Sequence, residues 1–133
     1  MNSAELAAIV QLVPFSAHLG FELMACDAKA VVVEVELKPE HCTAGGTAHG
    51  GFLMTLADFA GAASAFQVLP EGAKGTTTIE RKTNMMAAAS VGTRLRATAT
   101  PVHVGRRTSV WQTRVETPDG KLVSLTTQTQ MAL

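Results

Sequence analysis

Residues 49–69 read HGGFLMTLADFAGAASAFQVL, which is apolar almost throughout except for one acid, Asp58, near its middle. The stretch predicts a long helix from about Gly50 to Leu69 that is apolar nearly all round, and therefore enclosed rather than laid on a surface. A membrane span is the competing interpretation, but an acid at the centre of a span costs roughly 2.5–3.5 kcal/mol. We therefore expect a helix buried in protein and not in lipid.

Segments with the two-residue periodicity of strands lie on both sides of this helix. In one of them Val33 and Val35 share a face and Glu34 lies on the other, which is the pattern of a half-buried strand. The predicted strands are Phe21–Asp27, Ala30–Leu37, Thr76 to about Met85, Thr93–His103, Thr108–Thr117 and Lys121 to about Met131. Met85 and Met86 are expected to pack in the core.

A shorter helix is expected at the N-terminus, where Leu6, Ile9 and Val10 follow helical spacing. Ser3 is its predicted N-cap, and Pro14 is its predicted end. No basic residue precedes the apolar stretch, so we do not expect a signal peptide.

The predicted order of elements is a helix, two strands, the long helix and four strands in a meander, within one domain over residues 1–133. A lone apolar helix with a mostly antiparallel sheet indicates the α+β class, with the sheet curled around the helix. One helix covers only one face of such a sheet and leaves an edge strand open. We therefore expect pairing with another copy, a dimer at minimum.

The composition limits the partners and the cofactors. Eleven basic residues balance eleven acidic ones, so no overall field attracts a polyanion and nucleic acid is not an expected partner. Cys26 and Cys42 are too few for a disulfide framework or a four-ligand zinc site, and they indicate a reduced, cytoplasmic setting. His18, His41 and His103 have no partner at metal-ligand spacing, so no metal site is expected.

The start of the long helix has the features of a site for acyl transfer. It begins through Gly50 and Gly51, whose N–H groups have no partner in the helix and no Cβ to shield them. With the helix dipole, these groups would stabilise a carbonyl oxygen that gains negative charge. Asp58 is the candidate carboxylate, because an acid in an apolar helix is costly unless it is paired or used. The alternatives are that packing alone requires the glycines and that Asp58 is satisfied by a loop or an arginine.

The run HGGFLMTLAD at residues 49–58 resembles the signature of the PaaI-type branch of the hotdog-fold acyl-CoA thioesterases, which includes phenylacetyl-CoA thioesterases. TTTIE at 76–80, VHVGRR at 102–107 and DGKLV at 119–123 resemble the same branch, and the similarity covers about residues 19–131. The resemblance implies a curved antiparallel sheet wrapped around one long central helix. It also implies hydrolysis of a small or medium acyl-CoA, aromatic or aliphatic, with no cofactor beyond the CoA of the substrate. The expected assembly is a homodimer, with further pairing into a homotetramer left open by the sequence.

The resemblance also implies roles for the matching positions. Gly50 corresponds to the oxyanion donor through its backbone N–H, His49 to the residue beside it that orients the site, and Asp58 to the nucleophile or general base. Thr78 falls where the family often carries a hydroxyl that supports the acid or the attacking water. Six residues before His49 the family commonly has Asn, whereas this chain has Thr43, whose hydroxyl lacks the geometry of the amide.

Arginines are the candidates for holding the phosphates of CoA, because the planar donor fork of arginine suits phosphate recognition. Arg106 and Arg107 fall at the tip of a predicted hairpin. Arg81 and Arg94 are the other two candidates, with no firm choice among the four.

The spacing between the two central candidates predicts a site shared by two copies. Gly50 and Asp58 lie eight positions apart, which separates them by about 12 Å along one helix. An oxyanion donor has to lie about 3 Å from the oxygen of a carbonyl whose carbon the acid must also reach, directly or through one water. We therefore expect antiparallel helices to bring Gly50 of one copy to Asp58 of the other, giving two sites per dimer.

Two other functions remain open from the sequence. Hydration of enoyl thioesters would need an Asp–His pair at the Cα and Cβ of the substrate, and binding of acyl-CoA without catalysis is kept open by Thr43. A serine hydrolase is not indicated, because no Gly-x-Ser-x-Gly pattern occurs.

Overall fold

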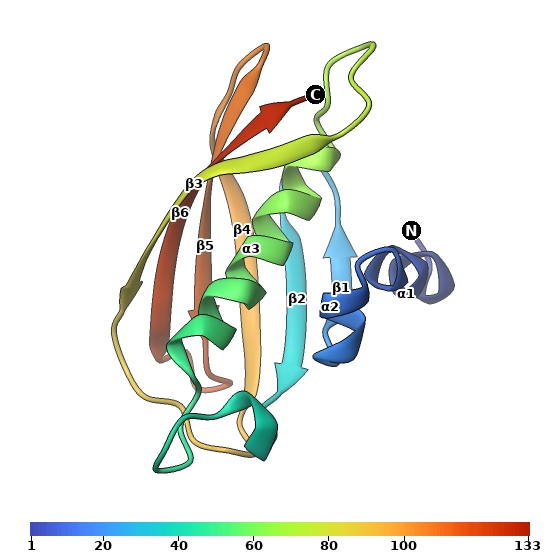
Figure 1. Ribbon diagram of the computed structural model, residues 1–133. Helices are drawn as coiled ribbons and strands as arrows, with labels where there is room; N and C mark the ends of the chain where they lie inside the picture. Colours follow the sequence, from blue (N-terminus) through green and yellow to red (C-terminus); the bar gives the residue numbers. More distant parts are fainter.

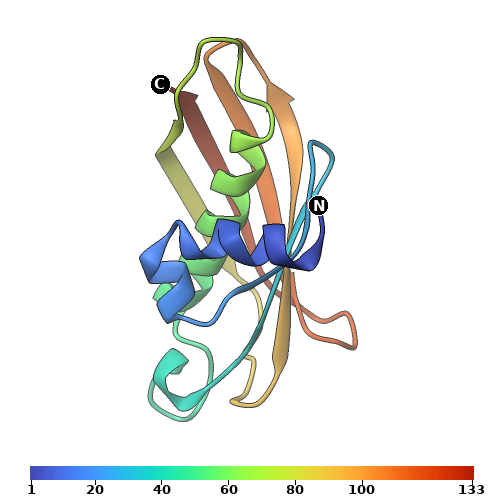
Figure 2. The same cartoon turned by 90° about the vertical axis from the view of Figure 1, so that its right-hand side faces the viewer.

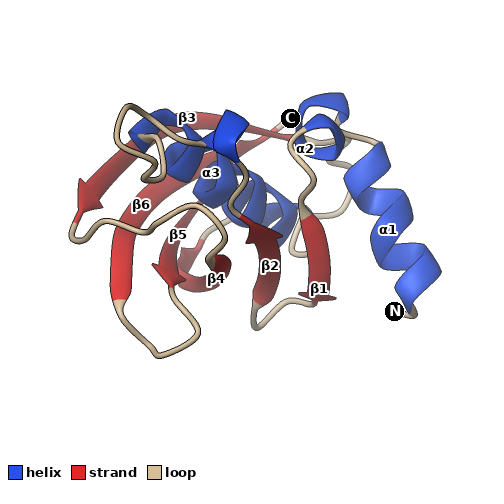
Figure 3. Ribbon diagram, turned by 90° about the horizontal axis from the view of Figure 1, so that it is seen from below, coloured by secondary structure: helices blue, strands red, loops and turns tan.

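The long helix, α3 (Gly50–Phe66), lies against the concave side of a curved six-stranded antiparallel sheet in the computed structural model, which describes residues 1–133 (Figure 1, Figure 3). The strands are β1 (Glu22–Cys26), β2 (Val31–Glu36), β3 (Thr76–Met85), β4 (Arg94–Val104), β5 (Thr108–Glu116) and β6 (Leu122–Ala132). The other helices are α1 (Ser3–Gln11), α2 (Pro14–His18) and the 3-10 helix η1 (Pro39–His41). The predicted α+β class and the curved sheet around one long helix are therefore confirmed. No helix is both long enough and apolar enough to cross a membrane.

The order of the strands differs from the predicted meander. The sheet runs β1-β2-β4-β5-β6-β3, so β4, β5 and β6 form a meander while β3 lies at the far edge beside β6. The chain leaves β2, crosses the concave face as α3 and enters the sheet again at the opposite edge, which leaves β2 free to pair with β4. Alternation of residues indicates which side chains are buried, but not which strands are neighbours, and the prediction was wrong for this reason.

The helix ends also differ from the predictions in detail. Asn2 and not Ser3 caps α1: its Oδ1 accepts the N–H of Glu5 at 2.9 Å, and the carboxylate of Glu5 accepts the N–H of Asn2 at 2.9 Å. Pro14 ends the first helical segment but also opens α2 at a position where a missing N–H costs little. α3 ends at Phe66 rather than Leu69, because the last turn tightens into bonds between residues three apart.

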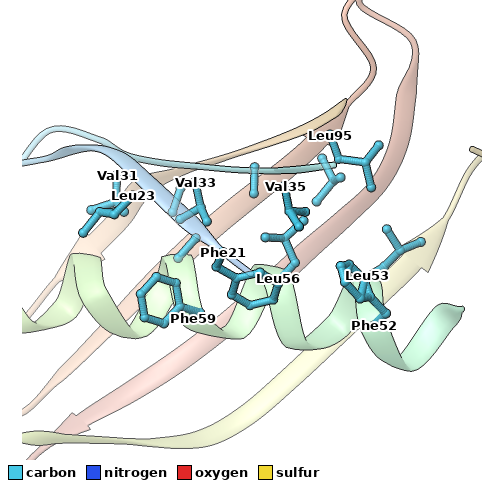
Figure 4. Close-up of a cluster of buried hydrophobic side chains, with 14 of the residues drawn as sticks. Phe21, Leu23, Val31, Val33, Val35, Phe52, Leu53, Leu56, Phe59 and Leu95 are labelled. Carbon is cyan, nitrogen blue, oxygen red and sulfur yellow. The ribbon is translucent and has the colours of Figure 1, made fainter. Parts of the chain in front are cut away.

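The apolar core fills the space between α3 and one half of the sheet (Figure 4). Alternate residues of β2 and β4 face the helix and are almost wholly buried: Val31, Val33, Val35, Leu95, Ala97 and Ala99. From α3, Phe52, Leu56 and Phe59 pack against them, and the ring of Phe52 meets that of Phe21 edge-on at 5.7 Å. Each large side chain buried in this way contributes about 1.5–3 kcal/mol, so this half of the interface holds the helix in place.

The edge strand β3 is left open on one side. It pairs only with β6, so the N–H and C=O groups of its other edge have no partner strand along Thr76–Met85. Met85 and Met86, which were expected in the core, are exposed at its end. Met85 extends toward Gly50 at the start of α3 instead of into the core.

A cluster of charges ties three strands together on the convex face of the sheet. Glu34 of β2 accepts hydrogen bonds from Arg94 Nε at 2.7 Å and from Arg96 Nε at 2.9 Å, and Arg94 also contacts Glu22 of β1. Burial raises the pKa of Glu34, but the hydrogen bonds and charges of the two arginines outweigh this and hold the pKa below its ordinary value. The ionised form of Glu34 therefore stabilises the fold.

Replacing this carboxylate is expected to weaken the fold in a pH-dependent way. Glu34→Gln should lower the free energy of unfolding by about 1–2 kcal/mol near neutral pH, because Arg94 and Arg96 lose their shared counterion and are only partly screened by solvent. A lowered pKa in the folded state means that the contribution is present above the pKa of the unfolded chain, about 4.3, and is lost as the pH falls through the folded value. Urea unfolding of both proteins at about pH 7 and about pH 3 measures this. If the two proteins differ in free energy of unfolding by the same amount at both pH values, the ionised form of Glu34 does not stabilise the fold.

Candidate active site

The first turn of α3 presents an amide without a partner. His49 is the N-cap residue, and its Nδ1 accepts the N–H of Gly51 at 2.9 Å. The first helical bond runs from the N–H of Leu53 to the carbonyl of His49 at 3.1 Å. The N–H of Gly50 makes no hydrogen bond within the chain. It therefore remains free to donate at the positive end of the helix dipole.

Asp58 lies two turns further along α3, and all its side-chain contacts fall on one oxygen. Its Oδ1 accepts the hydroxyl of Thr78 at 3.0 Å and the amide of Gln128 at 3.3 Å, and it also contacts the guanidinium of Arg81. Oδ2 has no partner within the chain. The carboxylate is thus held at one oxygen and free at the other, with 33% of the side chain exposed. Such a group can add to an electrophile or accept a proton from water.

A buried network behind Asp58 sets the direction of the hydrogen bonds. The hydroxyl of Thr78 has one proton, which goes to the carboxylate, so the amide of Gln130 must donate to the Thr78 oxygen. The carbonyl of Gln130 in turn accepts the hydroxyl of Thr76 at 2.9 Å. Gln130 is almost fully buried and the two threonines are half-buried, so the network is partly shielded from water and orients the carboxylate.

A β-bulge explains why Arg81 also reaches Asp58. In the register of β3 with β6, Thr78 lies opposite Gln130 and Arg81 opposite Gln128, with a shift between Thr78 and Glu80. The extra residue turns Arg81 toward the helix, whereas strict alternation would point it away. Arg81 was predicted to contact CoA. The structure pairs it with Asp58, which the period-two pattern could not indicate, and its contact with CoA stays a prediction.

Gln128 and Gly61 are the residues that sequence reasoning missed. The side chain of Gln128 is 1% exposed, and its amide also donates to the backbone carbonyl of Asp58 at 3.4 Å. A Cβ on Gly61 would lie 2.1 Å from Gln128 Oε1, so any larger residue here would require the side chain of Gln128 to shift. The available signal was a set of polar residues at every second position of the last strand: Thr126, Gln128 and Gln130.

The remaining predicted residues lie apart from Asp58. His49 and Gly50 stand at the start of α3, and Thr43 is exposed in the preceding loop, where its N–H bonds to the carbonyl of Thr47 at 2.8 Å. Arg106 and Arg107 are exposed in the turn between β4 and β5, which lies near the other end of α3 (Figure 1). Arg94 is held by the carboxylates of the convex face. One chain therefore gathers Asp58 with its partners but keeps the helix start and the exposed arginines at a distance.

Comparisons with known proteins agree with this architecture. Residues 45–124 match the family model of the thioesterase superfamily. A putative esterase of Archaeoglobus fulgidus is 33% identical over 93 residues, which are 70% of this chain and 58% of that protein. The chain thus spans less than two thirds of the length of this relative.

Two solved structures show the same fold. A variant of the phenylacetic acid degradation protein PaaI from Thermus thermophilus superposes with a TM-score of 0.83 at 32% identity, covering 90% of this chain and 99% of that chain. A thioesterase from Haemophilus influenzae superposes with a TM-score of 0.88 at 25% identity, covering 96% of this chain and 90% of that chain.

The close approach of Gly61 to Gln128 can be tested by a double-mutant cycle. Gly61→Ala is expected to lower the free energy of unfolding by about 1–3 kcal/mol, because the added methyl group overpacks the interface. In a Gln128→Ala background, Gly61→Ala should raise the free energy of unfolding by up to about 1 kcal/mol, because alanine favours a helix. Urea unfolding of the four proteins gives both values. A loss of equal size in the two backgrounds would mean that Gln128 is not what requires the glycine.

Proposed function

The chain belongs to the thioesterase superfamily and has its hotdog fold, and from this premise we propose that it hydrolyses acyl-CoA thioesters to the free acid and CoA. The observation that carries the proposal is the state of Asp58. Thr78, Arg81 and Gln128 hold one carboxylate oxygen, and the other oxygen is free to react. A carboxylate held in this way is oriented for one task while keeping a reactive atom available.

The site is completed by a second copy. β3 spans the two halves of the site, since Thr78 near its start contacts Asp58 and Met85 at its end lies against Gly50. If the open edges of two β3 strands pair antiparallel about a two-fold axis, the end of one strand meets the start of the other. This pairing would bring Gly50 of one copy toward Asp58 of the other. A dimer would then contain two equivalent sites, and pairing of dimers into a tetramer would leave them intact.

In the proposed reaction the carbonyl oxygen of the thioester accepts the N–H of Gly50. Asp58 Oδ2 of the other copy adds to the carbonyl carbon, or it takes a proton from a water that adds. The negative charge that develops on the oxygen is stabilised by the Gly50 amide and the helix dipole. The C–S bond then breaks and CoA leaves as a thiolate. If Asp58 adds directly, water hydrolyses the resulting anhydride and restores the carboxylate.

The other predicted residues are assigned to supporting roles in this proposal. His49 fixes the first turn by accepting the N–H of Gly51 and so leaves the Gly50 amide free. Thr43 lies in the loop before the helix start and would contact the thioester or the water through its hydroxyl. Arg106 and Arg107 are the exposed cations that we assign to the phosphates of CoA. The free thiols of Cys26 and Cys42 are compatible with the proposed cytoplasmic location.

Binding of acyl-CoA without hydrolysis is the second candidate function. The ion pair between Asp58 and Arg81 within one chain favours it, because it engages the carboxylate before any substrate arrives. Hydration of enoyl thioesters has no such support. The Nδ1 of His49 already accepts the N–H of Gly51, which ties the imidazole to the helix start.

Removing the charge of Asp58 tests the reaction. Asp58→Asn is expected to lower kcat/KM for the best acyl-CoA by at least about 100-fold, because an amide can neither attack nor accept a proton. Release of the CoA thiol measures turnover, and light scattering checks that the dimer persists. Asp27→Asn is the matched control at an exposed turn and should keep full activity. Undiminished turnover in Asp58→Asn would remove this carboxylate from the mechanism. Tight binding of acyl-CoA by a wild-type protein that releases no CoA would favour the second candidate.

The shared site can be tested by removing the Gly50 amide alone. Proline fits the first position of a helix, and the extended backbone of His49 (φ −66°, ψ 135°) suits a residue before proline. Gly50→Pro should therefore keep the helix but lower activity by about 100-fold or more, whereas Gly50→Ala keeps the N–H and should lose less.

Mixed dimers then decide whether the site is shared. A dimer of one Gly50→Pro chain and one Asp58→Asn chain, purified through two different tags, has one site with both defects and one intact site. We expect about half of the wild-type activity from it. An inactive mixed dimer would place the whole site within one chain.

A further inference from the structure

A hollow of about 440 Å³ lies between the N-terminal helix and α3. Ile9 and Leu12 line it from the side of α1, and Phe59, Ala63 and Phe66 line it from α3. Eight of its ten lining residues are apolar, and no lining side chain carries a charge. Figure 2 shows α1 crossing in front of α3 on this side of the molecule.

The hollow lies next to the candidate site, because two of its lining residues are neighbours of Asp58 and Thr78. Ala62, which lines it, stands one helical turn beyond Asp58, so the two side chains are neighbours on the surface of α3. Thr76, which also lines it, lies two residues before Thr78 on the same face of β3, and both threonines contact Gln130. A group that is held at Asp58 can therefore extend directly into the hollow.

The chemistry of the hollow fits one part of a thioester. Its volume lies within the range of small-molecule pockets, about 300–1,000 Å³. The absence of charged side chains makes it unsuitable for the phosphates of CoA or for an acyl group that ends in a carboxylate. Leu12 is 80% exposed and Phe66 is 57% exposed at its rim, so an apolar ligand would remove both from water.

We propose that this hollow binds the acyl group of the substrate, and that it selects an unsubstituted apolar group of medium length. The inference rests on the proposed function and adds the class of acyl group to it. Acetyl is too short to reach past Ala62, and a terminal carboxylate would lose its hydration without gaining a partner. The substrate class thus follows from α1 and the second half of α3, and not from the reacting groups.

The test measures the turnover of three thioesters by wild-type protein and by two variants, one that fills the hollow and one that places a charge at its rim. Wild-type protein should have a kcat/KM for octanoyl-CoA at least about tenfold above those for acetyl-CoA and adipyl-CoA. Ala63→Leu fills the hollow and should lower the ratio of octanoyl to acetyl turnover by about tenfold. Leu12→Glu places a charge at the rim, and it disturbs the core little because this side chain is exposed. It should lower the same ratio. Ala8→Leu, on the exposed side of α1, is the matched control and should leave the ratio unchanged.

A binding measurement separates failure of this inference from failure of the proposed function. Dansyl-undecanoic acid should fluoresce on binding to wild-type protein, and Ala63→Leu and Leu12→Glu should weaken its binding by about tenfold. If wild-type protein binds the probe but releases CoA from no thioester, the proposed hydrolysis fails while the hollow stands as an apolar site. If thioesters are hydrolysed with unchanged ratios and the probe binds all variants equally, the hollow is not the acyl site.

A second copy is the competing occupant of the hollow. Light scattering of the same variants measures their molar mass and so detects whether the hollow is occupied by a second copy. If Ala63→Leu and Leu12→Glu shift the protein to monomers without changing the turnover ratio or the binding of the probe, the hollow is part of an interface, and the inference is overturned.

Discussion

The carboxylate of Asp58 has to be satisfied on a helix that is otherwise apolar, and this requirement organises the centre of the structure. Partners reach it from two neighbouring strands, Thr78 and Arg81 on β3 and Gln128 on β6. Without such partners, the partial removal of this carboxylate from water would cost free energy with no compensation. The acid therefore joins α3 to the far edge of the sheet, where few apolar side chains are available to do so.

The concave face of the sheet is divided into two halves by this arrangement. Under β2 and β4 it is apolar, and the aromatic residues of α3 pack there with almost complete burial. Under β6 and β3 it is polar, with Thr126, Gln128 and Gln130 buried in a row beneath the helix. The glycine at position 61 lets α3 descend onto this polar half. The apolar half supplies most of the stability through burial, and the polar half holds a carboxylate in one orientation.

Three groups that remain unsatisfied within one chain lie on α3 and β3. They are the N–H of Gly50, the second oxygen of Asp58 and the open edge of β3. A closed monomer would be expected to pair such groups. Their presence on two adjacent elements supports a protein that is completed by a second copy and by a substrate. The apolar hollow next to Asp58 extends the same surface toward α1.

The sequence by itself determined the elements and the candidate residues, because both depend on local properties. A nearly continuous apolar stretch located α3, and alternation located the strands. The glycine pair and the isolated acid at residues 50–58 indicated where chemistry would occur. Only the tertiary structure decided that β3 lies at the edge of the sheet and that a bulge turns Arg81 onto Asp58. It also decided that Gln128 lies beneath Gly61. These features depend on which strands become neighbours and on one extra residue in a register. The packing of distant segments determines the pairing of the strands and the position of the bulge, and a local sequence pattern does not indicate either of them.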